Sequence, residues 1–567
     1  MRRTGTEALR RFALLLALLG STVAPLTAQH EHHQGMTMSG DPAAWRMPPM
    51  DPNMPMLPGL ETALPPVAPF LLGTGLDPES FPEARPSEMI DVQAGDTVDM
   101  EVSIVRRTIA GQSYLMYGYD GQYPGPLLRA PQGTTVVVRL TNNIEMPTTV
   151  HWHGVRLDNR FDGVPGLTQP PVAPGETFLY EVKVTDAGIY WYHPHVLEYI
   201  QQDLGLYGNL LVDSPDPDYY GPAHRQEMLV LDDVLIDEQG LIPWGESTPT
   251  HALMGRFGTV MLVNGTTEYG LDVDRGEVVR FFLTNVANTR TFNVVFGGAR
   301  VKIVASDVGR YEQEQWVESV VIAPAERYVV DVRFEESGPV AITNSIQAVN
   351  HFRGEFYPHV DTLGTVRVGA GAASPDLGQA FGTLRSHPDV IADIERFRAE
   401  FDREPDHELE LTVRVQDLPN PIVQSMLMDT LYVPPVEWND AMPMMNWLST
   451  GAQVTWIMRD PATGLENMDI DWSFTVGDVV KIRIFNDPKS FHPMQHPFHI
   501  HGQRFLVVSR DGVPADNLVW KDTAVVPVGS TVDFLVDITN PGDWMMHCHI
   551  SEHLEAGMMG TFHVQGG

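Results

Sequence analysis

Gly133-Thr-Thr-Val-Val-Val-Arg-Leu-Thr-Asn142 places a glycine and an asparagine nine positions apart, with a run typical of a β-strand between them. The same frame recurs at 276–285 as GEVVRFFLTN and at 477–486 as GDVVKIRIFN. Each copy is followed by a turn and a second strand, which begin at Pro174, Pro324 and Pro527, and then by Gly188, Gly338 or Gly542. The spacing predicts three copies of one all-β unit.

The distance between copies, about 140 to 200 residues, fits whole β-sandwich domains rather than the short units of a solenoid. Strands between Gly and Pro turns predict a Greek-key sandwich in each copy. We place the three domains at 85–215, 216–375 and 400–567. Residues 376–399 are expected to form a linker with a helix, which Pro388 and the apolar face of Ile391, Ile394 and Phe401 predict at about 388–402. Residues 29–84, rich in Met, His and Pro, are expected to form an extended arm.

Composition describes an acidic globular chain of 567 residues. Hydrophobic residues make up 43% and charged residues 19%, which argues against a disordered or fibrous protein. Asp and Glu (73) outnumber Lys and Arg (37), and the net charge of −36 repels phosphate backbones and anionic lipid. We therefore exclude nucleic acid as a partner. The single cysteine, Cys548, excludes an internal disulfide.

The first 28 residues have the pattern of an export signal. Four arginines and one glutamate in the first eleven residues precede the apolar run 12–19, and Leu26-Thr27-Ala28 offers a small-residue cleavage site. The apolar run is too short to span a bilayer, so we expect no transmembrane anchor. Arg10-Arg11-Phe12 resembles a twin-arginine signal, and either export route predicts a periplasmic or extracellular protein.

Histidines distinguish the outer copies from the middle one. Five residues after the third-repeat glycine lie His193 in the first copy, Thr343 in the second and His547 in the third. The outer copies hold four His-x-His pairs, and the middle copy holds none. The pairs are His151 with His153, His193 with His195, His499 with His501, and His547 with His549.

Strand geometry explains the spacing of two, because alternate side chains face the same side of a strand. In His547-Cys548-His549 the cysteine faces the other way, so this tripeptide is predicted to touch two metal sites. His496, Cys548, His553 and Met558 make a set of two imidazoles, one thiolate and one thioether, which is typical of blue copper. The eight paired histidines alone suit copper, iron, nickel or zinc, and the adjacent thiolate favours copper. A structural zinc site is disfavoured, because it closes with four ligands and needs no second cluster.

Four motifs resemble the copper signatures of the laccase-like multicopper oxidases, in that family's order. They are HWHG at 151–154, WYHPH at 191–195, HPFHIHG at 496–502 and HCHISEHLEAGM at 547–558. The resemblance extends from about residue 90 to the C-terminus and implies three cupredoxin domains that bind four copper ions. It implies a type 1 copper at His496, Cys548, His553 and Met558, a type 2 copper at His151 and His499, and a type 3 pair at His153, His193, His195, His501, His547 and His549.

The resemblance also implies a reaction. Single electrons from a donor enter at the exposed edge of His553 and pass through Cys548 to the flanking histidines, and four of them reduce O2 to water. Asp162 and Glu552 match acidic residues of the family and are expected to supply protons; the alternative for each is a solvated carboxylate.

Three functions stay open at this point. The first is a laccase-type oxidase, expected to be a monomer, that takes electrons from phenols or aromatic amines. The second is a metallo-oxidase that acts on Cu(I) in copper tolerance, which methionine-rich segments favour because thioethers select Cu(I), although Met also fills gaps in cores. These segments hold Met36, Met38, Met47, Met50, Met54 and Met56 with His30, His32 and His33, and Met426, Met428, Met442, Met444 and Met445. The third is a copper carrier or structural cupredoxin protein without turnover; a two-domain nitrite reductase is disfavoured, because it lacks a third domain.

Overall fold

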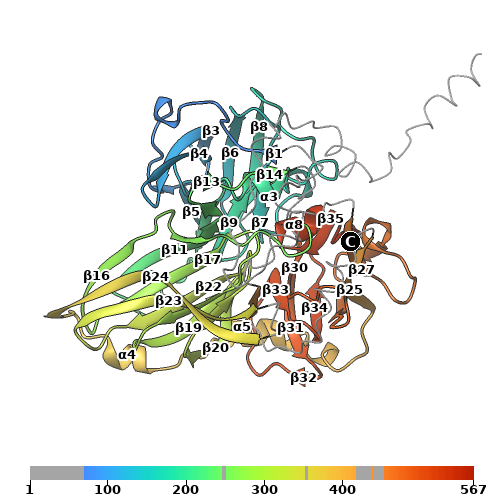
Figure 1. Ribbon diagram of the computed structural model, residues 1–567. Coiled ribbons are helices and arrows are strands. Elements are labelled where there is room, and N and C mark those ends of the chain that lie inside the picture. The colour runs from blue at the N-terminus through green and yellow to red at the C-terminus, as the bar shows by residue number, and fades with distance from the viewer. Residues whose placement is uncertain (1–68, 246–250, 351–354, 417–435, 439–452) are drawn as a thin grey trace, which may run out of the picture. The chain divides into compact units, whose positions relative to one another are not determined.

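A computed structural model describes residues 69–245, 251–350, 355–416, 436–438 and 453–567 (Figure 1). The predicted export signal, the arm up to residue 68 and both methionine-rich segments lie outside these residues. Strands dominate the described part and form three pairs of sheets. We call these pairs domain 1 (Met89 to Asp213), domain 2 (Arg225 to Ala372) and domain 3 (His407 to Gln565).

Domain 1 contains a four-stranded and a five-stranded sheet. The order β4-β3-β6-β8 is formed by β3 (Thr97–Ile109), β4 (Gln112–Tyr119), β6 (Thr135–Asn142) and β8 (Thr177–Lys183). The order β2-β5-β10-β9-β7 is formed by β2 (Met89–Asp91), β5 (Leu127–Pro131), β7 (His151–His153), β9 (Gly188–His193) and β10 (Gly208–Asp213). β3 and β6 are parallel, as are β5 and β10, whereas β6–β8 and β9–β10 are antiparallel.

Domain 2 has a similar pair of sheets, but its first sheet has six strands instead of four. Its first sheet, β15-β11-β17-β22-β19-β20, is formed by β11 (Arg225–Val234), β15 (Val260–Val263), β17 (Val278–Asn285), β19 (Arg300–Ser306), β20 (Gly309–Val317) and β22 (Arg327–Arg333). Its second, β16-β24-β23-β18-β21, is formed by β16 (Tyr269–Arg275), β18 (Phe292–Phe296), β21 (Val320–Ile322), β23 (Gly338–Asn350) and β24 (Glu355–Ala372). The short strand β26 (Val436–Trp438) pairs in parallel with β23, although the sequence placed these residues in the third domain.

Domain 3 has the same strand order again. The sheet β27-β25-β29-β34-β31-β32 is formed by β25 (His407–Val415), β27 (Val454–Arg459), β29 (Val479–Asn486), β31 (Arg504–Arg510), β32 (Val513–Pro514) and β34 (Thr531–Asp537). The sheet β28-β36-β35-β30-β33 is formed by β28 (Asp471–Thr475), β30 (His496–Ile500), β33 (Thr523–Val526), β35 (Gly542–Cys548) and β36 (Met559–Gln565). The predicted all-β fold of three cupredoxin-like domains is confirmed.

The asparagine of the repeated frame holds two segments that follow its strand. Asn142 Nδ2 donates to the carbonyls of Met146 (2.9 Å) and Val172 (2.8 Å), which follow its strand. Asn285 and Asn486 each donate to two backbone carbonyls in the same way. All three side chains are buried, and each satisfies its amide group with two backbone carbonyls of these segments, which explains why the residue recurs.

The glycine of the frame begins each strand with a left-handed turn. Gly133, Gly276 and Gly477 have φ of +86°, +83° and +102°. Their N–H groups donate to Val184, Phe334 and Ile538, the residues that follow the antiparallel neighbour of each strand. In the second repeated turn, domain 2 has Ala325 at φ +69° where domain 1 has Gly175. The turn geometry is therefore kept even where the glycine is not.

Helices are short and lie between or beside the sheets. They are α3 (Glu198–Gln201), α4 (Gly378–Gly382), α5 (Pro388–Glu395) and α8 (Ser551–Glu555), with 3-10 turns η2 (Pro78–Ser80), η3 (Asn159–Phe161), η4 (Arg398–Glu400) and η5 (Asn467–Asp469). Helix α5 begins at Pro388 as expected but ends at Glu395, short of residue 402. Two residues later, the ring of Phe397 packs edge-on against Trp520 of domain 3, with ring centroids 5.3 Å apart. Asp389 of the same helix pairs with Arg310 of domain 2.

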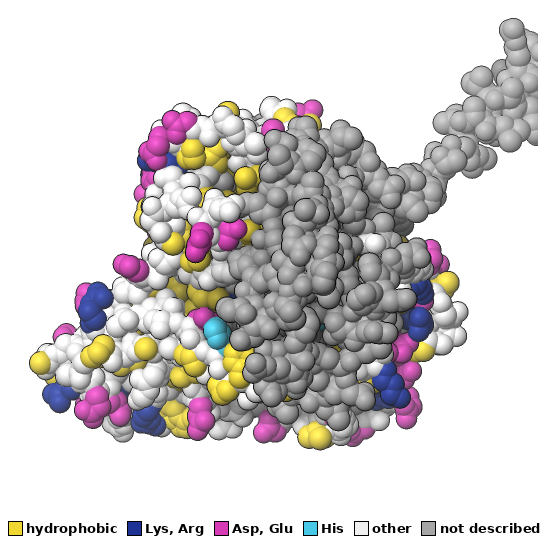
Figure 2. Space-filling view, in the orientation of Figure 1, with side chains coloured by type: hydrophobic (Ala, Val, Ile, Leu, Met, Phe, Trp, Pro, Cys, Tyr) yellow, Lys and Arg dark blue, Asp and Glu magenta, His cyan; other side chains and the backbone are white. Residues whose placement is uncertain are grey.

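Two short strand pairs lie outside the main sheets of the three domains. Strand β1 (Pro69–Phe70), at the end of the predicted arm, pairs with β14 (Trp244–Gly245), and β12 (Ile236–Asp237) pairs with β13 (Gly240–Leu241). Acidic side chains are spread over the described part of the face shown in Figure 2, consistent with the acidic composition. Within the described ranges, no helix has the length and apolarity that crossing a bilayer requires.

Candidate metal centre

The first of two adjacent sites brings together the single thiol and two imidazoles in domain 3. His496 opens β30, Cys548 ends the neighbouring strand β35, and His553 lies on α8 (Figure 1). Cys548 Sγ lies 3.4 Å from His496 Nδ1 and 3.8 Å from His553 Nδ1, and the two Nδ1 atoms are 3.3 Å apart. Three soft or borderline ligand atoms thus converge on one point, as a copper site requires.

Burial controls the electrostatics of this site. Desolvation lowers the pKa of His496 to about 3, so its imidazole is neutral and free to bind a cation. Burial raises the pKa of the Cys548 thiol, and the N–H of Ile550, which donates to Sγ at 3.4 Å, opposes that rise. Met558 is buried in the same core cluster, and its carbonyl accepts from the Cys548 N–H at 3.1 Å. The backbone of the predicted axial residue therefore lies beside that of Cys548.

His553 differs from the expectation of an exposed imidazole edge, because its side chain is 0% exposed. The indole of Trp456 stacks on its ring with centroids 4.0 Å apart. Trp456 in turn donates to the carbonyl of Ala252 at 2.8 Å, and 252–257 contributes Leu253, Met254 and Phe257 to the domain 3 core. The expectation was wrong because a loop of domain 2, which the histidine motifs do not signal, covers the site.

The second site contains all eight paired histidines, four from domain 1 and four from domain 3. Each side chain is at most 2% exposed. Three groups of ring nitrogens lie close enough to share an ion: His151, His153 and His499; His153, His193 and His549; and His195, His501 and His547. The two domains are therefore joined by interleaved histidines, although the pairs are up to about 400 residues apart in sequence.

The pairs lie mostly at strand ends, so strand alternation accounts for their direction only in part. His151 and His153 both lie within β7, but His195, His501 and His549 follow the last residues of β9, β30 and β35. Within 547–549 the expected division holds: His547 and His549 join the eight-histidine cluster, and Cys548 joins the other site.

Backbone carbonyls set the orientation of several rings. The Nδ1 atoms of His151, His193 and His499 lie 2.7, 2.9 and 2.8 Å from the carbonyls of Asp162, Pro194 and Asp522. A carbonyl can only accept, so Nδ1 carries the proton and Nε2 is left with a lone pair. Those three Nε2 atoms are buried without a hydrogen-bond partner. Outer groups that orient a ring in this way are typical of metal-binding histidines.

The charge state of the cluster also fits a metal. Burial lowers the pKa of His153, His193 and His499 well below the usual value, and neighbouring imidazoles lower it further. The pKa of His547 is lowered to about 4, first by burial. Neutral rings with unpartnered buried nitrogens cost free energy unless something binds them. The residues present therefore fit copper ions held by imidazoles.

Of the two predicted acids, only Asp162 lies against the histidines. It follows η3 and is 0% exposed, and its Oδ2 lies 2.8 Å from His501 Nδ1. Its Oδ1 lies 3.3 Å from His151 Nδ1, so one carboxylate contacts a histidine of each domain.

Glu552 is also buried, but it faces domain 2. Its Oε2 accepts from the Thr289 hydroxyl at 3.0 Å, and its Oε1 lies 3.4 Å from Asn288 Nδ2. Desolvation raises its pKa to about 7, so the carboxyl is half protonated near neutral pH. Neither acid is the solvated carboxylate that was the alternative.

Three further residues at the cluster were missed by sequence reasoning. Glu198, three residues after the WYHPH motif, lies 3.8 to 3.9 Å from His193, His195 and His549. Asp522 lies 3.0 Å from His153 Nε2 and pairs with Arg327 of domain 2. Glu198 could have been predicted from its position close to a histidine pair in the sequence. Asp522 and Arg327 have no such neighbouring motif.

Comparison with known proteins matches each of the three domains to the same kind of protein. Three family models, each described as multicopper oxidase, match residues 101–217, 216–356 and 422–567. Dihydrogeodin oxidase of Aspergillus terreus is 25% identical over 82% of this chain and 82% of its own length. A copper resistance protein A homolog of Pseudomonas syringae pv. tomato is 25% identical over 84% of this chain and 93% of its own.

A solved structure agrees with these matches. The multi-copper oxidase from Pseudomonas thermotolerans is 25% identical, with a TM-score of 0.61 over 84% of this chain and 100% of that chain. The chain belongs to the laccase-like multicopper oxidases, a family of copper oxidoreductases.

Proposed function

We propose that the protein is a laccase-type oxidase, which takes one electron from each of four phenol or aromatic amine molecules and reduces O2 to two waters. One observation carries the proposal: the tripeptide His547-Cys548-His549 joins a thiol site to an eight-imidazole cluster with no intervening residue. Four electrons and four protons convert one O2 into two waters, so the chain must both collect single electrons and supply protons.

Four copper ions fit the donor atoms. His496, Cys548, His553 and Met558 would hold the type 1 ion. His151 and His499 would hold the type 2 ion, and the remaining six histidines of the cluster would hold the type 3 pair. When bound, copper supplies the one-electron oxidation of the donor and the reduction of O2.

The chain supplies the route and the environment. The peptide bonds that flank Cys548 are the shortest covalent connection between the two sites. The buried surroundings of the cluster exclude bulk water, which strengthens every electrostatic contact within it. Because Trp456 and 252–257 cover His553, we propose that donors approach over this cover rather than contact the imidazole edge directly.

Asp162 and Glu552 are the proposed proton carriers. Asp162 can accept from His501 Nδ1 at Oδ2 and carry a proton on its other oxygen, Oδ1. Burial raises the pKa of Glu552 to about 7, although the hydrogen bonds from Thr289 and Asn288 lower it, and such a pKa suits a group that both accepts and gives protons.

A second candidate is oxidation of Cu(I) in copper tolerance. It is favoured by the methionine-rich segments of the sequence and by the similarity to a copper resistance protein A homolog. Export to the periplasm or medium, by a twin-arginine or ordinary signal, and a monomeric state complete the proposal; the N-terminal residues support the export route.

The test begins with the copper-loaded protein. We expect an intense absorption band at the red end of the visible spectrum from the thiolate–copper bond, and O2 uptake with a phenol. Steady-state rates with the phenol and with Cu(I), measured side by side, separate the two candidates. Cys548→Ser should abolish the band and the oxidase activity, and a colourless loaded protein would contradict the proposal.

A further inference from the structure

Arg327 of domain 2 has a guanidinium group that reaches all three domains. It lies in β22, in the second-repeat turn and strand, and its side chain is 0% exposed. Nε donates to the carbonyl of Ile189 in domain 1 at 3.0 Å, and one terminal nitrogen donates to the carbonyl of Ala325 at 3.1 Å. Both terminal nitrogens donate to Asp522 of domain 3, at 2.7 and 2.5 Å. This fork-to-fork pair fixes the plane of the Asp522 carboxylate.

Asp522 in turn contacts histidines of both cluster domains. Its Oδ1 lies 3.0 Å from His153 Nε2, and its carbonyl accepts from His499 Nδ1 at 2.8 Å. The Thr523 hydroxyl donates to the same Oδ1 at 2.9 Å. With Nε2 of His153 turned to this carboxylate, its Nδ1 faces the cluster, buried and without a hydrogen-bond partner.

The glycine of the first histidine motif packs closely against the Arg327–Asp522 pair. Gly154 has φ of +82°, and a Cβ placed on it would lie 2.2 Å from Asp522 Oδ2 and 2.7 Å from an Arg327 nitrogen. Backbone and side chains at this point leave no room for an atom. The glycine after His153 is therefore required by the Arg327–Asp522 pair as well as by the turn.

The pair belongs to a buried network of two cations and three carboxylates. Asp307 lies 3.5 Å from Arg327 and 3.0 Å from Lys521 Nζ, which also lies 3.3 Å from Glu326. Arg327 thus contacts Asp522 and Asp307, and Lys521 contacts Asp307 and Glu326. Removal of the arginine would leave one cation among three buried carboxylates.

We propose that Arg327 is a positioning residue of the metal centre, which acts through Asp522 to fix the rings of His153 and His499. Domain 2 supplies none of the eight clustered histidines, but through the Arg327–Asp522 pair it orients two of them. The inference rests on the proposed function, because it takes these two histidines as copper ligands.

Arg327→Lys is the first test. Lysine keeps the charge, but one ammonium group cannot hold both carboxylate oxygens in a plane. Loss of an outer partner of this kind weakens metal binding by about 10- to 100-fold, so we expect copper to leave the cluster at lower chelator concentration. The type 2 copper signal in electron paramagnetic resonance should change as well, while the type 1 absorption per bound type 1 ion stays the same.

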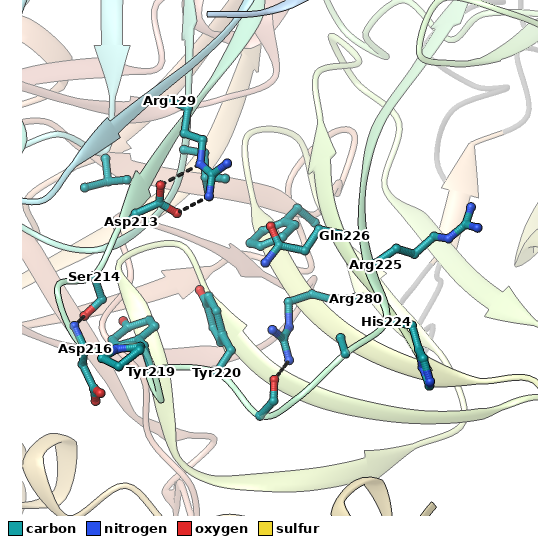
Figure 3. A pocket seen from close by; sticks show the side chains of 16 residues that line it. Arg129, Asp213, Ser214, Asp216, Tyr219, Tyr220, His224, Arg225, Gln226 and Arg280 are labelled. Atoms are coloured by element: carbon teal, nitrogen blue, oxygen red, sulfur yellow. Dashed lines mark hydrogen bonds and ion pairs between the residues drawn. The ribbon is translucent and has the colours of Figure 1, made fainter. Parts of the chain in front are cut away.

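Arg280→Lys is the matched control. Arg280 makes the same kind of buried pair, with Asp331 at 2.8 and 2.9 Å, in the same domain. It lines a separate cavity of about 610 Å³, whose lining residues include Arg129 and Tyr220 and none of the clustered histidines (Figure 3). Arg280→Lys should lower the melting temperature and leave the copper signals unchanged.

Arg327→Gln combined with Asp522→Asn covers the case in which Arg327→Lys does not fold, since it removes both charges of the pair together. It too should retain copper less tightly. If either Arg327 variant folds and keeps wild-type copper retention and the wild-type type 2 signal, Arg327 only packs the domains and the inference is wrong. Copper-loaded wild-type protein without any type 2 signal contradicts the proposed function, and this inference with it.

Discussion

At the residue scale, the histidine rings of the cluster are oriented by oxygen atoms that contact one ring nitrogen and leave the other nitrogen facing the cluster. Asp162 is the clearest case, because its carbonyl orients His151 and its carboxylate contacts His501. A side chain in this position can both orient a ligand and carry a proton, and the two roles differ in what they predict.

Asp162→Asn separates these roles. The amide keeps the size and one hydrogen bond but cannot deliver a proton, so we expect reoxidation of the reduced enzyme by O2 to slow by about 10- to 100-fold. The type 1 absorption should stay intact, because that site lies on the other side of the tripeptide. Stopped-flow mixing of reduced enzyme with O2 measures the effect. Asp158→Asn, which removes an exposed carboxylate in the preceding turn, is the control; equal rates in the two variants would remove Asp162 from the relay.

Glu552 predicts a pH-dependent stability in the copper-free protein. Its pKa rises from 4.5 unfolded to about 7 folded, so the unfolded chain ionises first as the pH rises. The carboxyl therefore stabilises the fold fully below about pH 4.5, and this contribution is lost as the pH rises to 7. Relative to wild type, Glu552→Gln should gain about 2–3 kcal/mol of unfolding free energy between pH 5 and 8. Denaturant titration at several pH values measures it, with Glu555→Gln of the same helix as the control; parallel pH profiles for wild type and Glu552→Gln would contradict the assignment.

At the element scale, the repeated Gly and Asn frame explains why three divergent sequences give one strand order. The asparagine bonds carbonyls from two later segments, so it fixes the loop after its strand and the neighbouring sheet together. In domain 3 one of these carbonyls belongs to Met494, two residues before His496. The same element therefore supports the fold in domain 2 and both fold and site in domain 3.

Asn285→Ala and Asn486→Ala test this difference. Each removes two hydrogen bonds to backbone carbonyls, which should cost about 1–3 kcal/mol of unfolding free energy. Calorimetry should show the loss in both. The blue absorption should change only in Asn486→Ala, because only its partners lie next to a proposed ligand. An unchanged spectrum in both variants would mean that His496 is held by other contacts.

At the scale of the whole molecule, domains 1 and 3 share the cluster and are joined around it by polar contacts. Asn540 Nδ2 donates to the carbonyl of Leu157 at 2.6 Å, and Arg156 donates to Thr539 at 2.8 Å. Ions bound between histidines of both domains would add to this interface, because ligands that bind only the folded state stabilise it.

Copper removal should therefore lower the melting temperature, by roughly 5 °C or more. Calorimetry of the loaded and the chelated protein checks this, and readdition of copper should restore the transition. Cys548→Ser, which retains the eight clustered histidines, should still show most of the stabilisation. If removal of copper leaves the transition in place, the cluster does not hold the domains together.

Local pattern was enough to predict the strands, the three-fold repeat and the grouping of histidines, because side-chain alternation and ligand spacing are properties of short segments. The fold and the family predicted from them are confirmed; the copper ligands and the proton roles of Asp162 and Glu552 stay predictions. The sequence pattern did not show that His553 is covered, since its cover comes from a loop about 300 residues earlier in the chain.

The amino-acid sequence by itself determined the all-β fold of three repeated units and named the residues that are candidates for copper binding. Only the tertiary structure decided which groups contact and orient these residues: Asp522 is 369 residues from His153, and Arg327 is 195 residues from Asp522. The physical reason is that a buried charge or polar atom must find a partner wherever domain packing places one, and that choice leaves no local signature in the chain.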